Sequence, residues 1–208
     1  MSHHSRSLLC SGLLSAVALI PSIGTAAVIA SYDFNTGSDT EGWTSLAVTG
    51  LTTSAGFITG TASGNDPQLL KNAGSLTVGA GQTWDTVVFR VREFDDASGK
   101  YIGSEGAPTF NTTGLIVQVN TTIISSGFTV IASGDNFHTI TTDISGLAAA
   151  EITNIRVDPI GGAFSNSGAE TNGNTFEVDF IRINAVPEPA SALLGGLGML
   201  MLLRRRRW

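Results

Sequence analysis

The chain has 208 residues, and its 11 basic and 17 acidic residues give a formal net charge of −6. Five basic residues lie in the terminal segments, so residues 28–185 keep six basic against sixteen acidic residues, a net charge near −10. A surface of that sign disfavours binding to nucleic acid and to anionic lipid. It leaves cations and uncharged sugars as compatible partners.

The first 27 residues have the organisation of a secretory signal peptide, which signal peptidase removes. Arg6 gives a basic start, residues 8–20 are largely apolar, and residues 24–27 offer small side chains for cleavage after either alanine at the end. Cys10 is the only cysteine and lies inside this segment. The exported protein is therefore expected to contain no thiol and no disulfide.

Residues 28–185 are predicted to form one all-β domain, a single β-sandwich. Nine short β-rich runs alternate with turn residues: 28–34, 56–62, 75–78, 86–94, 115–120, 127–132, 138–142, 152–157 and 175–183. In the fourth run Val87, Phe89 and Val91 share one face, as in a half-buried strand. Strands of this spacing with Gly-rich turns are typical of a sandwich. Residues 145–151 are predicted to form one helical turn.

Four short segments of this domain resemble galactose-binding-like jelly rolls, a fold that many carbohydrate-binding modules share. Residues 32–34 (Tyr-Asp-Phe) and 41–43 (Glu-Gly-Trp) are similar to their opening, and residues 155–159 and 176–183 are similar to their closing strands. The resemblance implies that the first and last strands lie side by side. Fold alone does not fix function, because non-binding surface domains share this shape.

Oxygen-bearing side chains alternate in the loop after the first run, at Asp33, Asn35, Asp39 and Glu41. Calcium takes six to eight oxygen ligands, so this loop is a candidate site for structural calcium. The jelly-roll resemblance implies that Asn35 and Asp179 lie near the ion, although the family often has Glu where Asn35 stands. With Asp33 of the loop, they are the candidate calcium ligands. The alternative is a solvated acidic loop without an ion.

Trp84, Arg90 and Arg92 are the candidate carbohydrate-binding residues. Trp84 precedes a strand and could stack on a sugar ring. Arg90 and Arg92 share a strand face, where they could donate hydrogen bonds to sugar hydroxyls or pair with local carboxylates.

The acidic residues Glu93, Asp95 and Asp96 lie at a strand end. They could act as acid and base in glycoside cleavage, but the sequence favours a solvated hairpin end. His138 is the only histidine outside the signal region, and we expect it to face solvent. With no second histidine and no cysteine in the exported part, neither a zinc site nor a nucleophilic triad is indicated. The sequence therefore predicts a protein that is not an enzyme.

Residues 186–208 begin with Val-Pro-Glu-Pro, continue with an uncharged apolar run at 190–203, and end with four arginines and Trp208. As a helix this run would reach about 21 Å, which is short against a bilayer core of about 30 Å. The arginines favour retention of the tail on the cytoplasmic side. The segment is typical of a marginal membrane helix.

The three-part tail resembles the PEP-CTERM sorting signal of Gram-negative bacteria. The resemblance implies recognition by an exosortase, a membrane-embedded cysteine transpeptidase or protease, at Pro187, Glu188 and Pro189. It implies a stop signal at Arg204, Arg205, Arg206 and Arg207. The protein would be anchored transiently in the inner membrane and then reach the cell surface or an exopolysaccharide matrix, as in a biofilm.

The sequence thus predicts an exported, non-enzymatic sandwich that binds polysaccharide weakly. Two alternatives stay open. One is a small polysaccharide lyase or glycoside hydrolase that uses the acidic cluster. The other is a structural matrix protein without a ligand.

Overall fold

The computed structural model describes residues 26–205, except residues 65, 108, 111, 113 and 161–172. Within the one described helix, it describes the side chains of residues 195–203 only. The predicted signal peptide up to residue 25, and Arg206 and Arg207 of the predicted stop signal, lie outside the described residues. The chain divides into two compact units. One ends at Glu188 and holds every described strand, and the other contains helix α1 (Pro189–Arg205).

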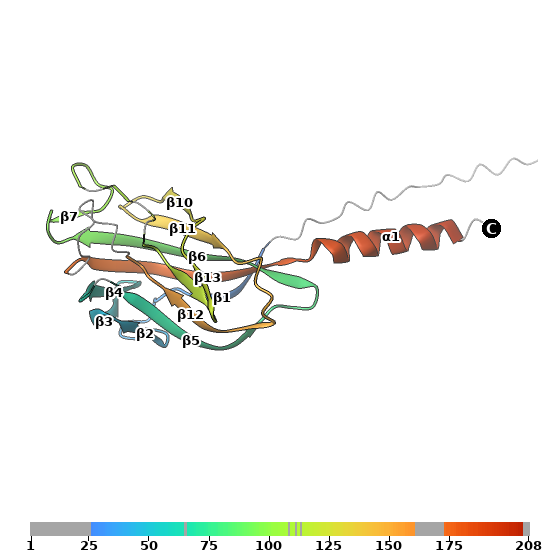
Figure 1. Ribbon diagram of the computed structural model, residues 1–208, viewed down its shortest axis with the longest axis horizontal. Helices are drawn as coiled ribbons and strands as arrows, with labels where there is room; N and C mark the ends of the chain where they lie inside the picture. Colours follow the sequence, from blue (N-terminus) through green and yellow to red (C-terminus); the bar gives the residue numbers. More distant parts are fainter. Residues whose placement is uncertain are drawn as a thin grey trace, which may run out of the picture. The chain divides into compact units, whose positions relative to one another are not determined.

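Thirteen described strands form two antiparallel sheets that share one apolar core (Figure 1). They are β1 (Ala27–Tyr32), β2 (Trp43–Leu46), β3 (Val48–Ser54), β4 (Phe57–Ala62), β5 (Gln68–Thr77), β6 (Gln82–Asp95), β7 (Lys100–Tyr101), β8 (Val117–Val119), β9 (Thr122–Ile124), β10 (Thr129–Ala132), β11 (His138–Asp143), β12 (Glu151–Val157) and β13 (Thr175–Pro187). The predicted β-sandwich is confirmed.

The larger sheet has eight strands in the order β10-β11-β6-β13-β4-β3, with β1 added on β13 and β7 on β6. The smaller sheet has five, in the order β2-β5-β12-β8-β9. Each of the nine predicted runs overlaps a strand of the structure. The predicted helical turn at residues 145–151 is wrong: this segment is a turn in which Leu147 N–H donates to the Ile144 carbonyl at 3.0 Å.

The strands β6 and β13 form the spine of the larger sheet. They pair from Phe94 opposite Thr175 to Gln82 opposite Pro187. The other edge of β13 pairs first with β4 and then with β1. The first and last strands therefore do lie side by side, as the jelly-roll resemblance implies. Alternation along β6 turns Val87, Phe89 and Val91 into the core.

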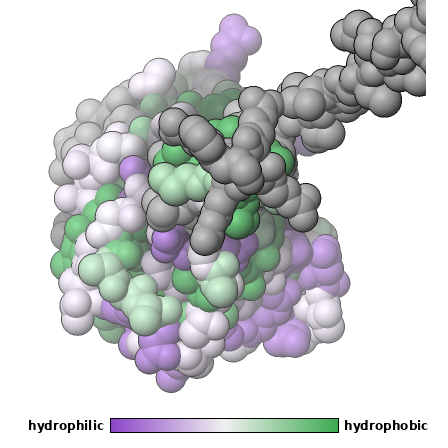
Figure 2. Space-filling model, turned by 90° about the vertical axis from the view of Figure 1, so that its right-hand side faces the viewer, coloured by the Kyte–Doolittle hydropathy of each residue, from purple (hydrophilic) through white to green (hydrophobic). Residues whose placement is uncertain are grey.

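The surface outside this core is mixed in character. On the face shown in Figure 2, hydrophobic and hydrophilic residues are interspersed over the coloured part of the sandwich. The exposed large aliphatic side chains of the described sandwich come from different strands, as Leu46 of β2, Ile123 of β9 and Ile131 of β10 do. Isolated exposed apolar residues are ordinary on a soluble surface.

Helix α1 covers the predicted apolar run and has 17 residues. Before it, β13 ends at Pro187, and the Glu188 N–H donates to the Gly81 carbonyl at 2.8 Å. Among residues 195–203 the large apolar side chains, such as Leu200 and Met201, are exposed. Within the described part of the chain, no helix is long and apolar enough to cross a membrane. The role of α1 in sorting stays a prediction.

Candidate functional site

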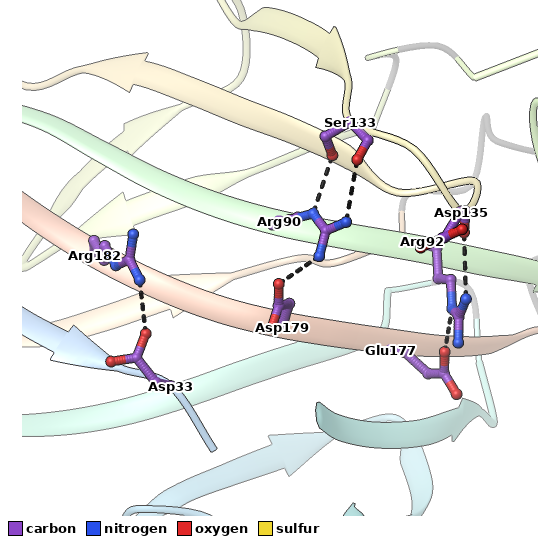
Figure 3. Close-up of polar contacts among 8 residues, drawn as sticks. All are labelled: Asp33, Arg90, Arg92, Ser133, Asp135, Glu177, Asp179 and Arg182. Atoms are coloured by element: carbon purple, nitrogen blue, oxygen red, sulfur yellow. Dashed lines mark hydrogen bonds and ion pairs between the residues drawn. The ribbon is translucent and has the colours of Figure 1, made fainter. Parts of the chain in front are cut away.

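The predicted arginines lie on the outer face of the larger sheet, where carboxylates from β13 meet them (Figure 3). Arg90 donates from Nη1 to Asp179 Oδ2 at 2.5 Å, and from Nε and Nη2 to the hydroxyl and carbonyl oxygens of Ser133 at 3.1 and 3.2 Å. Arg92 donates to the Glu177 carboxylate and to the Asp135 carbonyl. Two roles were predicted for these arginines, hydrogen bonding to sugar hydroxyls and pairing with local carboxylates. The structure shows the pairing.

Aromatic rings cover the same two guanidinium groups. The Arg90 guanidinium carbon lies 4.1 Å from the Phe137 ring centre, and that of Arg92 lies 4.5 Å from Phe137 and 4.7 Å from Tyr101. Cation–π contact and ion pairing together satisfy both charges. The side chains of Arg90 and Arg92 are 20% and 19% exposed, so little of either is presented to a ligand.

Trp84 is a core residue, which corrects its predicted role as a sugar-stacking platform. Its side chain is 2% exposed, and the indole N–H donates to the Ala149 carbonyl at 2.8 Å. A buried ring offers no face to a sugar. The cause is an extra residue in β6, because Val87 pairs with Ile183 but Trp84 with Ala185. This bulge reverses the alternation and turns Trp84 inward.

Two of the predicted calcium residues, Asp33 and Asp179, are each held by an arginine. Arg182 Nη2 donates to Asp33 Oδ1 at 2.9 Å, and Asp179 is held by Arg90. Although burial acts to raise it, hydrogen bonds from Arg182 and Ser31 hold the pKa of Asp33 below its ordinary value. Among the described residues, no group of three or more His, Cys, Asp or Glu is placed to hold a metal ion. The third candidate, Asn35, lies beside Gly56.

In the acidic loop after β1, two carboxylates accept hydrogen bonds from backbone N–H groups of the same loop. The Phe34 N–H donates to Glu41 Oε1 at 2.8 Å, and the Glu41 N–H donates to Asp39 Oδ1 at 2.8 Å. Asp39 and Glu41 thus accept from backbone N–H groups, whereas Asp33 and Asp179 have arginine partners.

Glu93 and Asp95 are buried, so the predicted solvated hairpin end is wrong for both. Glu93 is 1% exposed, and its Oε1 accepts a hydrogen bond from Asn174 Nδ2 at 2.6 Å, whereas Oε2 has no partner. Burial raises the pKa of Glu93 to about 8, and the nearby charge of Asp95 adds to the rise. Glu93 is thus a protonated interior group at neutral pH, out of reach of a polysaccharide. Asp96 is exposed, as predicted.

His138 also departs from prediction. Its ring stacks on Phe110 with centroids 4.0 Å apart, and burial lowers the pKa of the imidazole. It is half-buried under a loop instead of facing solvent.

A groove of about 360 Å³ crosses the outer face of the smaller sheet. Its described lining is Thr44, Gln68, Leu70, Lys71, Asn72, Gln118, Asn120, Asn154, Ile155 and Arg156. Antiparallel register sets these side chains in cross-strand rows. Arg156 on β12 lies opposite Leu70 on one side and Gln118 on the other, and Asn154 lies opposite Asn72.

Three side-chain amides that line the groove each have one of their two polar atoms hydrogen-bonded within the protein. Gln118 Nε2 donates to the Asn120 carbonyl at 2.8 Å, and Asn154 Nδ2 donates to Thr153 Oγ1 at 3.1 Å. Asn72 Oδ1 accepts from the Gly74 N–H at 3.1 Å. Within the described part of the chain, the other amide atom of Gln118, Asn154 and Asn72 has no partner. The groove therefore presents fixed acceptors and a donor to an incoming ligand.

Two further residues fix the shape of the groove. Asn120 adopts a positive φ of 53° at the β8–β9 turn, and its Oδ1 accepts from the Thr153 N–H at 2.8 Å, which ties the turn to β12. Arg156 donates from Nε and Nη2 to Asp158 at 2.6 Å each, and from Nη2 to Asp66 at 2.6 Å. Burial raises the pKa of Asp158 to about 6 against the opposing effect of Arg156, so the pair is ionised at pH 7.

Sequence reasoning missed this groove, although part of its signal was present. Polar residues recur at every second position in Gln118 and Asn120, and in Asn154 and Arg156. What the sequence does not show is that β5, β12 and β8, far apart along the chain, are neighbours in one sheet.

Comparisons with known proteins give little to add to this geometry. No family model and no curated protein matches the chain. Among solved structures, the chain is similar to the carbohydrate-binding module CBM6cm-2 from Cellvibrio mixtus lichenase 5A, solved in complex with cellotriose. The identity is 13%, the match covers 76% of this chain and 98% of that chain, and the TM-score is 0.33. A likeness of this size carries no information on ligand or site.

Proposed function

We propose that this chain is an exported, non-catalytic protein whose sandwich, a galactose-binding-like jelly roll, binds a neutral polysaccharide in the groove of the smaller sheet. The observation that carries the proposal is the set of half-anchored amides at Asn72, Gln118 and Asn154. Sugar hydroxyls both donate and accept hydrogen bonds, so they match a surface that offers both kinds of partner. Amides already fixed at one end lose little entropy when a ligand is bound.

The charge of the groove favours an uncharged ligand. The positive charge of Arg156 is compensated by Asp66 and Asp158. The domain as a whole carries a net charge near −10, which repels acidic polysaccharides. None of the described lining residues is aromatic, so the groove lacks the stacking energy of a ring platform. We expect weak binding, with dissociation constants of about 10⁻⁴ to 10⁻³ M.

The double variant Gln118→Ala/Asn154→Ala should weaken binding of a neutral oligosaccharide roughly tenfold. Each lost hydrogen bond is worth about 0.5–1.5 kcal/mol, and 1.4 kcal/mol is a factor of ten. The ligand is first selected on an array of neutral and uronic-acid glycans. Titration calorimetry on the full chain in a mild detergent then gives the affinities.

Asn184→Ala is the matched control, because Asn184 is a hydrogen-bonded asparagine on the larger sheet, where its Nδ2 donates to Thr86 Oγ1 at 3.0 Å. It should bind like the wild type. Equal affinity of the double variant and the wild type would refute the groove as the site. Failure of the wild type to bind any glycan would leave a ligand-free matrix protein as the better description.

The sorting part of the proposal is supported by the tail sequence. We propose signal peptidase and an exosortase-like membrane transpeptidase or protease as partners, transient anchoring in the inner membrane, and a final place at the cell envelope or in an exopolysaccharide matrix. Intact mass spectrometry of surface protein from the native host should show chains that end between Val186 and Pro189. Recovery of Trp208 on most of that protein would contradict processing at this signal.

A further inference from the structure

The strand β10 is the free edge of the larger sheet. Its register with β11 is regular, with Val130 opposite Ile140 and Ile131 opposite Thr139, and no other strand is hydrogen-bonded to it in the described part of the chain. Ile131 is 62% exposed at this edge. A free strand edge carries a row of N–H and C=O groups that another strand can pair with.

The groups that point outward from β10 follow from its register. The Ser133 N–H donates to the Phe137 carbonyl at 2.8 Å, one residue beyond the last pair of the ladder, Ala132 opposite His138. Hydrogen bonding alternates along an antiparallel strand, so Ile131 also directs its backbone toward β11. Val130 and Ala132 therefore direct their N–H and C=O groups outward, and these groups have no partner among the described residues.

This edge lacks most of the usual protections. Among the other described strands with a free edge in this sheet, bulges interrupt β1 between Val28 and Ala30 and β3 between Thr49 and Thr52, and β7 has only two residues. Bulges, charges and prolines on an edge discourage pairing with other chains. By contrast β10 is regular, and residues 106–134 contain no charged side chain. The feature of β10 that discourages pairing with another chain is its short length of four residues.

We propose that β10 pairs antiparallel with β10 of a second copy, around a two-fold axis at Ile131. In this register Val130 lies opposite Ala132 of the second copy, and each such pair exchanges two N–H···O bonds. Ile131 then faces its own counterpart across a non-hydrogen-bonded pair, with Cα atoms about 4.5 Å apart. The two larger sheets become one continuous sheet.

The chemistry of the edge selects a second copy as the occupant. A two-fold interface requires a surface that is complementary to itself, and the outward row of Val130 and Ala132 with Ile131 between them satisfies this requirement. Two domains that each carry a net charge near −10 repel one another, so they can approach best where the surface is uncharged. The dimer should be weak and should tighten with salt, because salt screens this repulsion. This inference is independent of polysaccharide binding.

Ala132→Pro is the sharpest test. Proline removes only an N–H that points away from β11, a position at which edge strands tolerate it. The full chain is examined in a mild detergent by analytical ultracentrifugation over a range of concentration and salt. The wild type should show a monomer–dimer equilibrium that strengthens with salt, and the variant should dimerise at least ~10-fold more weakly, with an unchanged melting temperature.

Ile131→Lys is the second variant, since it places like charges opposite each other without touching the backbone. It should also give monomer. Leu46→Lys is the control, because Leu46 is 56% exposed on an edge strand of the other sheet. A dimer that survives both β10 changes, as one held by α1 would, contradicts the proposal. So does a wild type that stays monomeric at about 1 mM, or a Leu46→Lys variant that loses the dimer equally.

Discussion

Replacing Glu93 with Gln should stabilise the protein by a few kcal/mol above pH 8 and leave it nearly unchanged below pH 4. The buried carboxyl has a pKa of about 8 against an ordinary value of 4.5. The folded state therefore holds this proton more tightly than the unfolded chain does. The free energy of unfolding therefore falls as pH rises from 4.5 to about 8. Between the pKa of the unfolded state and that of the folded state, the fall is about 1.36 kcal/mol for each pH unit.

Urea unfolding of the wild type and Glu93→Gln at intervals between pH 4 and 9 measures this effect. Gln keeps the carbonyl that accepts from Asn174 and cannot ionise, so its curve should lack this fall. Asp96→Asn is the control, because Asp96 is an exposed carboxylate at the same strand end. It should follow the wild type. Parallel curves for wild type and Glu93→Gln would show that Glu93 is ionised at little cost, and hence hydrated.

Trp84→Ala should cost about 3–5 kcal/mol, the range for removing a fully buried aromatic side chain. The change leaves a large cavity between the sheets and removes the partner of the Ala149 carbonyl. Trp84→Phe keeps most of the apolar volume and should cost markedly less. Chemical denaturation of the three proteins at one pH gives both values.

The two tryptophan variants separate a core role from a surface role. A sugar platform on the surface could be truncated with a change within about 0.5 kcal/mol. Such a small loss for Trp84→Ala would contradict the buried position. Equal losses for Ala and Phe would mean that the indole hydrogen bond, and not packing, dominates the contribution of this residue.

The larger strands could be predicted because their sequences alternate with the period of a half-buried strand. In β6 the alternation of Val87, Phe89 and Val91 identifies the inner face, and it extends to Glu93. The same alternation could therefore have predicted the inward position of Glu93. The four missed strands are short or irregular. The strands β7 and β9 have two and three residues, and β3 is interrupted by a bulge.

The site residues were harder to predict, because they depend on details that the sequence pattern does not contain. One bulge in β6 separates Trp84 from the face of Arg90 and Arg92. The ion partners of those arginines come from β13, 85 and 89 residues away along the chain. The groove likewise depends on the order of strands in the smaller sheet. Local pattern predicts which face a residue takes, but not which strand lies beside it.

The central claim, that a polysaccharide lies in the groove of the smaller sheet, is tested most directly by mapping amide chemical shifts. The ¹⁵N-labelled full chain in detergent is titrated with the best neutral oligosaccharide from the glycan array. Perturbed shifts should concentrate on β5, β12 and β8, and should include the side-chain amides of Gln118 and Asn154. Perturbations centred on Arg90 and Arg92, with the groove amides unmoved at saturation, would contradict the claim.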